Sequence, residues 1–194
     1  PVSNLYKQKA YPNGEDYGYI KINKVEVEGI AQDVKIAEPD DEILIVKLQT
    51  ELFPEERVNI AIYFEVLLPN CLHRFGYGDN TYNFGNFYPI ASVFENGSFG
   101  HDAYGANGDP FYSEMANYNV TITYNDNFTL ASSGKQISTE NKPNGFKTTQ
   151  ITANVVRDFA FVLSKRFDVI SGKAGKTTVY YYYYDDENAQ SNLQ

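Results

Sequence analysis

The sequence predicts an all-β protein with little or no helix. Its aromatic residues include 17 Tyr and 13 Phe but no Trp, and such side chains suit the pleated, half-buried surface of a sheet. Residues 57–68 alternate apolar and other side chains with period two, whereas no stretch of about 12 residues follows the helical period. We therefore expect a large antiparallel sheet or a sandwich-like, saddle-shaped assembly of strands.

The clearest strand is predicted at residues 57–68. Its apolar face consists of Val58, Ile60, Ile62, Phe64, Val66 and Leu68. Upstream, the apolar positions of residues 17–29 change parity between Ile22 and Val25. One extra residue in a strand would shift the parity in this way, so we expect a β-bulge or bend near Asn23.

Further strands are predicted wherever short apolar runs lie between Gly, Asn, Asp and Pro residues. They are expected at residues 42–49, 87–94, 117–124, 128–132, 146–153, 158–163, 167–170 and 176–184. Turns are expected at residues 125–127, 133–134, 143–145 and 172–175. The segments 70–86 and 95–110 break this rhythm, and are either functional loops or ordinary surface excursions.

Length and charge limit the domain count and the partners. We assign residues 1–184 to one β domain and the polar residues 185–194 to the start of a linker. The net charge is −9, from 16 Lys+Arg and 25 Asp+Glu, and no basic stripe is present to bind the phosphates of nucleic acid. No apolar run reaches the roughly 20 residues of a membrane span. The compartment is left open, because a targeting segment before Pro1 is compatible with the sequence.

The residues that metal or nucleophilic chemistry needs are few. His73 and His101 do not form a His-Glu-x-x-His pair, so we expect neither zinc nor another cofactor in this chain. Cys71 is the only cysteine, which excludes an internal disulfide. If Cys71 and His73 lay in a strand they would share one face, which leaves a thiolate–imidazole pair as a hypothesis.

A calcium site is a further hypothesis for the long loops. Its oxygen ligands would come from Asp79, Asp102, Asn107 and Asp109. Asp and Asn are also the usual turn-forming residues, so the same residues have a purely structural interpretation.

Five consecutive tyrosines occupy residues 180–184. In a strand, Tyr180, Tyr182 and Tyr184 would share one face, and Tyr181 and Tyr183 the other. One face is expected to pack on the core, while the other would meet a neighbouring domain, a carbohydrate or solvent. We assign Tyr180, Tyr182 and Tyr184 to a predicted interdomain face.

Three collinear segments carry a family resemblance. They are Asn-Phe-Tyr-Pro at residues 86–89, Asp-Pro-Phe-Tyr-Ser-Glu at 109–114 before the strand at 117–124, and Arg-Asp-Phe-Ala at 157–160 before Ser164 and Arg166-Phe167. Together with the alternating strand at 55–69, they resemble the N-terminal domain of the aminopeptidase N-like zinc metallopeptidases, the gluzincins. The similarity runs from about residue 17 to residue 184.

The resemblance implies a β domain that packs on a thermolysin-like catalytic domain and covers one side of its cleft. In that family the zinc ligands and the catalytic tyrosine belong to the next domain, and no position of this chain matches them. We therefore expect a non-catalytic chain. Its partners would be its own C-terminal catalytic domain, where zinc is expected, and the peptide substrate of the intact enzyme.

The resemblance also implies a polar side chain near the amino end of the substrate. By position the candidates are Asn83 and Asn86, with Tyr88 as a wall of the site. The family usually has Gln or Glu there, and Asn side chains readily cap turns, so a structural role for both amides is the competing interpretation.

Two other functions stay open at this point. A stand-alone carbohydrate- or protein-binding module would use surface tyrosines as stacking platforms. A cysteine-dependent hydrolase would use Cys71 and His73.

Overall fold

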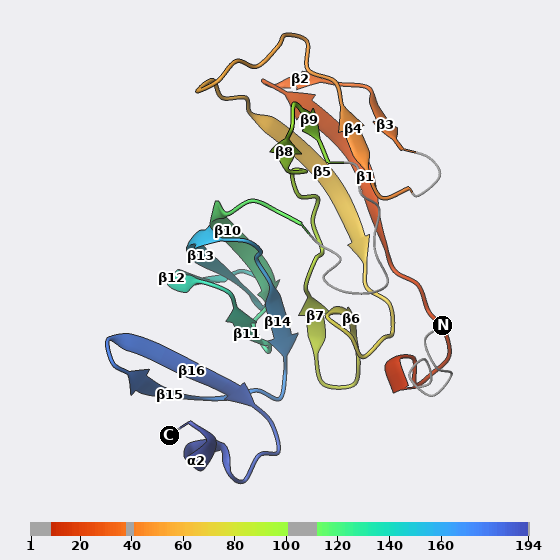
Figure 1. Cartoon of the computed structure of the whole chain (residues 1–194). Helices are drawn as coiled ribbons and strands as arrows, with labels where there is room; N and C mark the ends of the chain where they lie inside the picture. Colours follow the sequence, from red (N-terminus) through yellow and green to blue (C-terminus); the bar gives the residue numbers. More distant parts are fainter. Residues whose placement is uncertain (1–8, 38–40, 101–111, 194) are drawn as a thin grey trace. The chain divides into compact units, whose positions relative to one another are not determined.

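The all-β class is confirmed, because antiparallel strands dominate the chain and the helix α2 (Ala189–Asn192) is very short (Figure 1). The computed structural model describes residues 9–37, 41–100 and 112–193. The chain forms two compact units: Pro1–Tyr17, Leu68–Asn86 and Ala116–Gln194 make the first, and Gly18–Leu67 with Phe87–Met115 the second. The assignment of residues 1–184 to one domain stays a prediction.

The second unit contains a three-stranded sheet and two hairpins, all antiparallel. The sheet has the order β2-β1-β5 and the hairpins are β3–β4 and β8–β9. The strands are β1 (Tyr19–Val27), β2 (Ile30–Ala31), β3 (Val34–Ile36), β4 (Leu44–Val46), β5 (Ile60–Leu67), β8 (Phe94–Glu95) and β9 (Ser98–Phe99).

The register of β1 against β5 confirms the predicted bulge. Ile22 pairs with Phe64 but Lys24 pairs with Tyr63, so Asn23 is the extra residue. The shift turns Val25 into the apolar face of the sheet, where it is buried. The other face is polar, since Lys24 forms an ion pair with Glu26.

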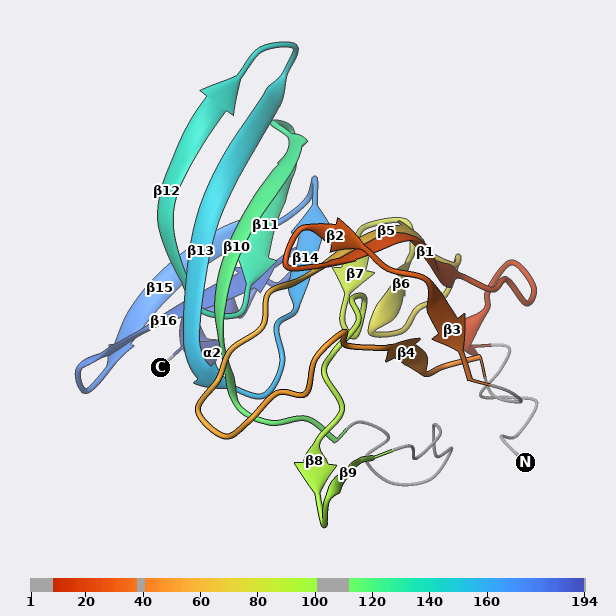
Figure 2. The ribbon, with the colours of Figure 1, turned by 90° about the horizontal axis from the view of Figure 1, so that it is seen from above.

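The first unit contains three antiparallel sheets. Their orders are β10-β13-β12, β11-β14-β7-β6 and β15-β16. Figure 2 shows the long hairpin of β12 and β13. The strands are β6 (Phe75–Tyr77), β7 (Tyr82–Phe84), β10 (Ala116–Asn125), β11 (Thr129–Ser132), β12 (Lys135–Lys142), β13 (Phe146–Val156), β14 (Phe161–Ser164), β15 (Asp168–Ala174) and β16 (Thr177–Tyr183).

The core of the first unit combines apolar and polar side chains. Ile151 and Phe159 are each 1% exposed. Beside them Thr149 is fully buried, and its hydroxyl is 2.9 Å from both the Tyr124 hydroxyl and the Thr139 hydroxyl. This chain of hydroxyls gives the buried hydroxyls of Tyr124 and Thr149 hydrogen-bond partners, as burial requires.

The predicted strand at residues 87–94 is wrong, because only Phe94 belongs to a strand. Pro89 interrupts the apolar run and has no N–H to donate to a ladder. Conversely, β6 and β7 lie in the segment predicted as a loop, and β12 was not expected because Ile137 is its only large apolar residue. In the described part of the chain, no helix is long and apolar enough to cross a bilayer.

Candidate functional site

Asn83 lies in the middle of β7. It pairs with Val162 of β14 on one side and Gly76 of β6 on the other. Its side-chain Nδ2 donates a hydrogen bond of 3.0 Å to the His73 carbonyl. The neighbouring Phe84 stacks on Phe161 with 4.3 Å between ring centroids, which fixes the strand and hence the position of Asn83.

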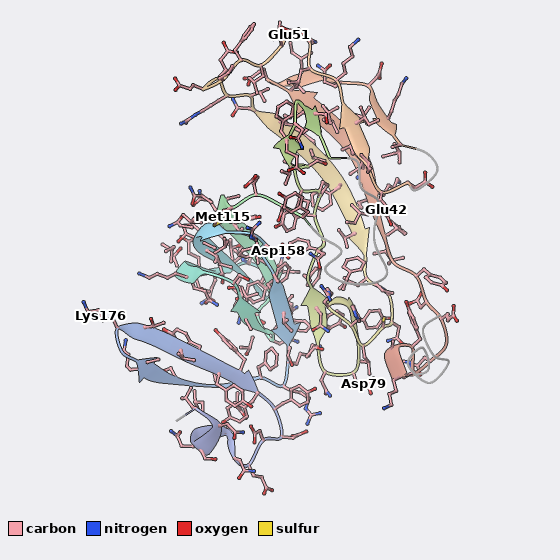
Figure 3. The ribbon with its side chains drawn as sticks, in the orientation of Figure 1. Glu42, Glu51, Asp79, Met115, Asp158 and Lys176 are labelled. Carbon is pink, nitrogen blue, oxygen red and sulfur yellow. The ribbon has the colours of Figure 1, made fainter. Side chains whose placement is uncertain are left out.

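Asn86 follows β7 in a left-handed backbone conformation, with φ 55°. Asn tolerates this conformation better than most residues, which explains its occurrence here. Its Nδ2 donates to Asp158 Oδ2 at 3.1 Å, while Asp158 Oδ1 accepts from the Phe159 N–H at 2.7 Å. Asp158, labelled in Figure 3, therefore joins residue 86 to the start of Arg-Asp-Phe-Ala.

Both amides thus donate to other parts of the first unit. Their Oδ1 atoms accept no hydrogen bond from the described residues. The hydrogen bonds from the two Nδ2 atoms support a structural role for both amides. The Oδ1 atom of each amide can still accept a hydrogen bond from a ligand. A substrate-binding role for Asn83 and Asn86 stays a prediction.

Tyr88 belongs to the second unit, whereas Asn83 and Asn86 belong to the first. Its half-buried ring meets the ring of Phe87 edge to face, with 5.1 Å between centroids. The role of Tyr88 as a wall of the substrate site stays a prediction.

The tyrosines of β16 divide between two faces, as the strand period predicts. Tyr181 and Tyr183 stack at 5.4 Å between ring centroids, and the Tyr181 hydroxyl donates to Asp186 Oδ2 at 2.9 Å. This hydrogen bond stabilises the neutral tyrosine and the ionised carboxylate. It therefore raises the pKa of Tyr181 and lowers the pKa of Asp186. The face of these two tyrosines is therefore linked to the segment that leads into α2.

The face predicted to meet another domain is partly covered. Tyr182 and Tyr184 contact the ring of Phe167, at 6.0 and 6.3 Å between centroids, and burial raises the pKa of Tyr182. Tyr180 is 60% exposed and Val169, paired with Tyr182 on β15, is 43% exposed. Tyr180 and Val169 are thus the open part of this face.

Cys71 and His73 do not lie in a strand, so the geometry assumed for a thiolate–imidazole pair is absent. The Cys71 thiol is buried against the hydroxyl of Tyr11, and the His73 side chain is exposed. Burial raises the pKa of the Cys71 thiol, which disfavours the reactive thiolate. No local pattern indicates the Tyr11 contact, because the two residues lie 60 positions apart and meet only in the folded chain.

The long loops carry the residues of the calcium hypothesis. Among the residues that the structure describes, no group of three or more His, Cys, Asp or Glu side chains could hold a metal ion. Of the four residues of the calcium hypothesis only Asp79 is described, and it is exposed. His101, Asp102, Asn107 and Asp109 lie outside the described residues.

Comparison with known proteins adds no relative. No model of a known protein family matches the chain, and no curated protein matches it.

Proposed function

We propose that this chain is a non-catalytic N-terminal domain of an aminopeptidase-like zinc metallopeptidase. It would pack on the catalytic domain and help to form the substrate cleft, while the zinc and the catalytic residues would belong to that other domain. The main support is that two of the three segments that resemble the aminopeptidase family meet in the first unit. The hydrogen bond from Asn86 to Asp158 joins them, although 72 residues separate the two positions.

The local geometry gives this proposal a chemical basis. Asn86 presents an Oδ1 acceptor next to the exposed carboxylate of Asp158. An ammonium group donates three hydrogen bonds and is stabilised by a nearby carboxylate. The free amino end of a peptide is the ligand that such a pair of oxygen acceptors suits.

The exposed part of the β15–β16 hairpin supports a docking role. Tyr180 and Val169 form an open apolar edge beside the partly covered Tyr182 and Tyr184. Aromatic residues of this kind are enriched at protein interfaces, because a large apolar ring and a polar hydroxyl work together there.

The decisive experiment joins this chain to the polypeptide encoded after Gln194. We expect that polypeptide to contain His-Glu-x-x-His with a Glu about 18 residues later. In the joined protein, Asn86→Ala should raise KM for peptides with a free amino end. It should leave unchanged the inhibition constant of N-acetylated peptides, which lack that amino end. A reading frame that stops at Gln194, or unaided peptide cleavage by this chain, would contradict the proposal.

A second candidate function is a carbohydrate-binding module, which the 60% exposure of Tyr180 favours. Sugar rings stack on exposed aromatic side chains because the ring face is apolar. Titration of the chain with oligosaccharides, compared with Tyr180→Ala, separates the two functions. Saturable binding that the variant loses would favour the module over the docking domain.

A further inference from the structure

The second unit contains a pocket of about 420 Å³ at one end of its three-stranded sheet. This volume lies within the range of about 300–1,000 Å³ that is common for small-ligand sites. The loop between β4 and β5 forms one wall and the turn from β1 to β2 the other. Its lining includes Val27, Glu28, Leu48, Glu51, Glu56 and Val58.

The turn from β1 to β2 is well defined. Glu28 and Gly29 both have positive φ, at 50° and 79°, as a two-residue type I′ hairpin requires. The Glu28 carboxylate accepts the N–H of Asn59 at 2.6 Å and the Asn59 amide at 3.2 Å, while Glu28 N–H donates to the Asn59 carbonyl at 2.9 Å. These bonds tie the turn to the residue that leads into β5.

The opposite wall is a loop with a tight turn of its own. Phe53 N–H donates to Glu56 Oε2 at 2.9 Å, and Glu56 N–H donates to the Phe53 carbonyl at 3.1 Å. Glu51, labelled in Figure 3, lies in the same loop. In the described part of the chain, neither Glu51 nor Arg57 forms a hydrogen bond or an ion pair.

The pocket is amphipathic, and its charge is unbalanced. Val27 is buried, and Leu48 and Val58 are half-buried beneath the rim. The rim carries the carboxylates of Glu28, Glu51 and Glu56 against the single guanidinium of Arg57. The bonds from Asn59 lower the pKa of Glu28, so this carboxylate is ionised at neutral pH.

We propose that this pocket binds a lysine or arginine side chain of a partner polypeptide. Its aliphatic stem would lie on Val27, Leu48 and Val58, and its cationic head among the rim carboxylates. Long basic side chains bury their methylene groups along apolar surface while the charge stays near water, and this pocket offers both environments. The excess of negative charge on the rim selects a cation over an anion.

This inference concerns the second unit and does not depend on the proposed function. It is tested by NMR titration of the ¹⁵N-labelled 194-residue chain with the tripeptide acetyl-Leu-Lys-Leu-amide. We expect saturable shifts at the amides of residues 27–30 and 48–58. The same peptide with norleucine in place of lysine should bind about threefold or more weakly, as expected for loss of exposed charge contacts. Higher salt should reduce this difference.

The variant Glu51→Gln/Glu56→Gln should lose the preference for lysine over norleucine. Gln keeps an acceptor for the Phe53 N–H, so the loop should keep its turn. The matched control is Asp33→Asn/Glu55→Gln, which removes the same charge from residues that do not line the pocket. The proposal is overturned if the two peptides bind equally, if neither binds up to its solubility limit, if the shifts lie elsewhere, or if the control variant loses the preference to the same extent.

Discussion

Two aromatic segments of the first unit differ in burial. Phe159 is 1% exposed and packs against Tyr118, with 6.0 Å between ring centroids. Tyr180 of β16 is 60% exposed, although it belongs to the most aromatic run of the chain. The difference follows from the sheets: Phe159 lies between strands of a three-stranded and a four-stranded sheet, whereas β16 pairs with β15 alone. Two paired strands cannot bury both of their faces without help from other elements.

The largest effect is expected from Phe159→Ala. Truncation of a fully buried Phe should lower the free energy of unfolding by about 3–5 kcal/mol, because a cavity is left. Tyr180→Ala should change it by less than about 0.5 kcal/mol, as for most exposed sites. Denaturant unfolding of both variants measures the contrast, and equal losses would contradict the comparison.

A smaller loss is expected when the buried hydroxyl chain is broken. Thr149→Val leaves the Tyr124 hydroxyl without its partner at 2.9 Å. An unsatisfied buried hydroxyl should cost about 1–3 kcal/mol of unfolding free energy. In the Thr149→Val background, Tyr124→Phe should cost less than it does in the original chain, and additive losses in the double-variant cycle would argue against this coupling.

Substitutions of Asn86 test its hydrogen bond with Asp158 and its left-handed backbone conformation. Asn86→Ala should lower the free energy of unfolding by about 2 kcal/mol, since Ala is strained at positive φ and the hydrogen bond is lost. Asn86→Gly adopts the same φ without strain, so about half of that loss should remain. If the two variants unfold at the same denaturant concentration, the left-handed conformation of residue 86 contributes nothing.

The smallest effect is expected at the exposed tip of the second unit. The pKa of Glu28 is lowered in the folded chain, so the stabilisation from its bonds with Asn59 is present at neutral pH and is lost as the pH falls through the folded pKa. Glu28→Gln keeps an acceptor but cannot titrate. Its unfolding free energy should therefore depend less on pH in the acid range than that of the original chain. An acid-range slope equal to that of the original chain would contradict this role of Glu28.

The sequence was most informative where one face of a strand is buried. The parity change between Ile22 and Val25 located the bulge at Asn23, because a one-residue slip would expose Val25. Pattern reading failed at β12, where a largely polar strand pairs with β13 through its backbone and leaves no apolar period. It also placed a strand at residues 87–94, where Pro89 breaks the ladder.

In the candidate sites, too, local patterns could be read from the sequence but long-range contacts could not. The tyrosine faces of β16 could be assigned from a period of two, but the covering of one face by Phe167 could not. The contacts of Asn86 with Asp158 and of Glu28 with Asn59 join residues 72 and 31 positions apart. No local pattern reports such pairs. The pocket of the second unit, which the turn at Glu28 helps to frame, was not predicted either.

The sequence by itself determined the all-β class, the main strands and their turns, because burial of one face and the backbone preferences of Gly, Asn and Pro act over a few residues. Only the tertiary structure decided which strands pair, which aromatic rings are buried and which amide meets which carboxylate. These contacts depend on where distant segments meet, and the free energy of each is realised only when the whole sheet has formed.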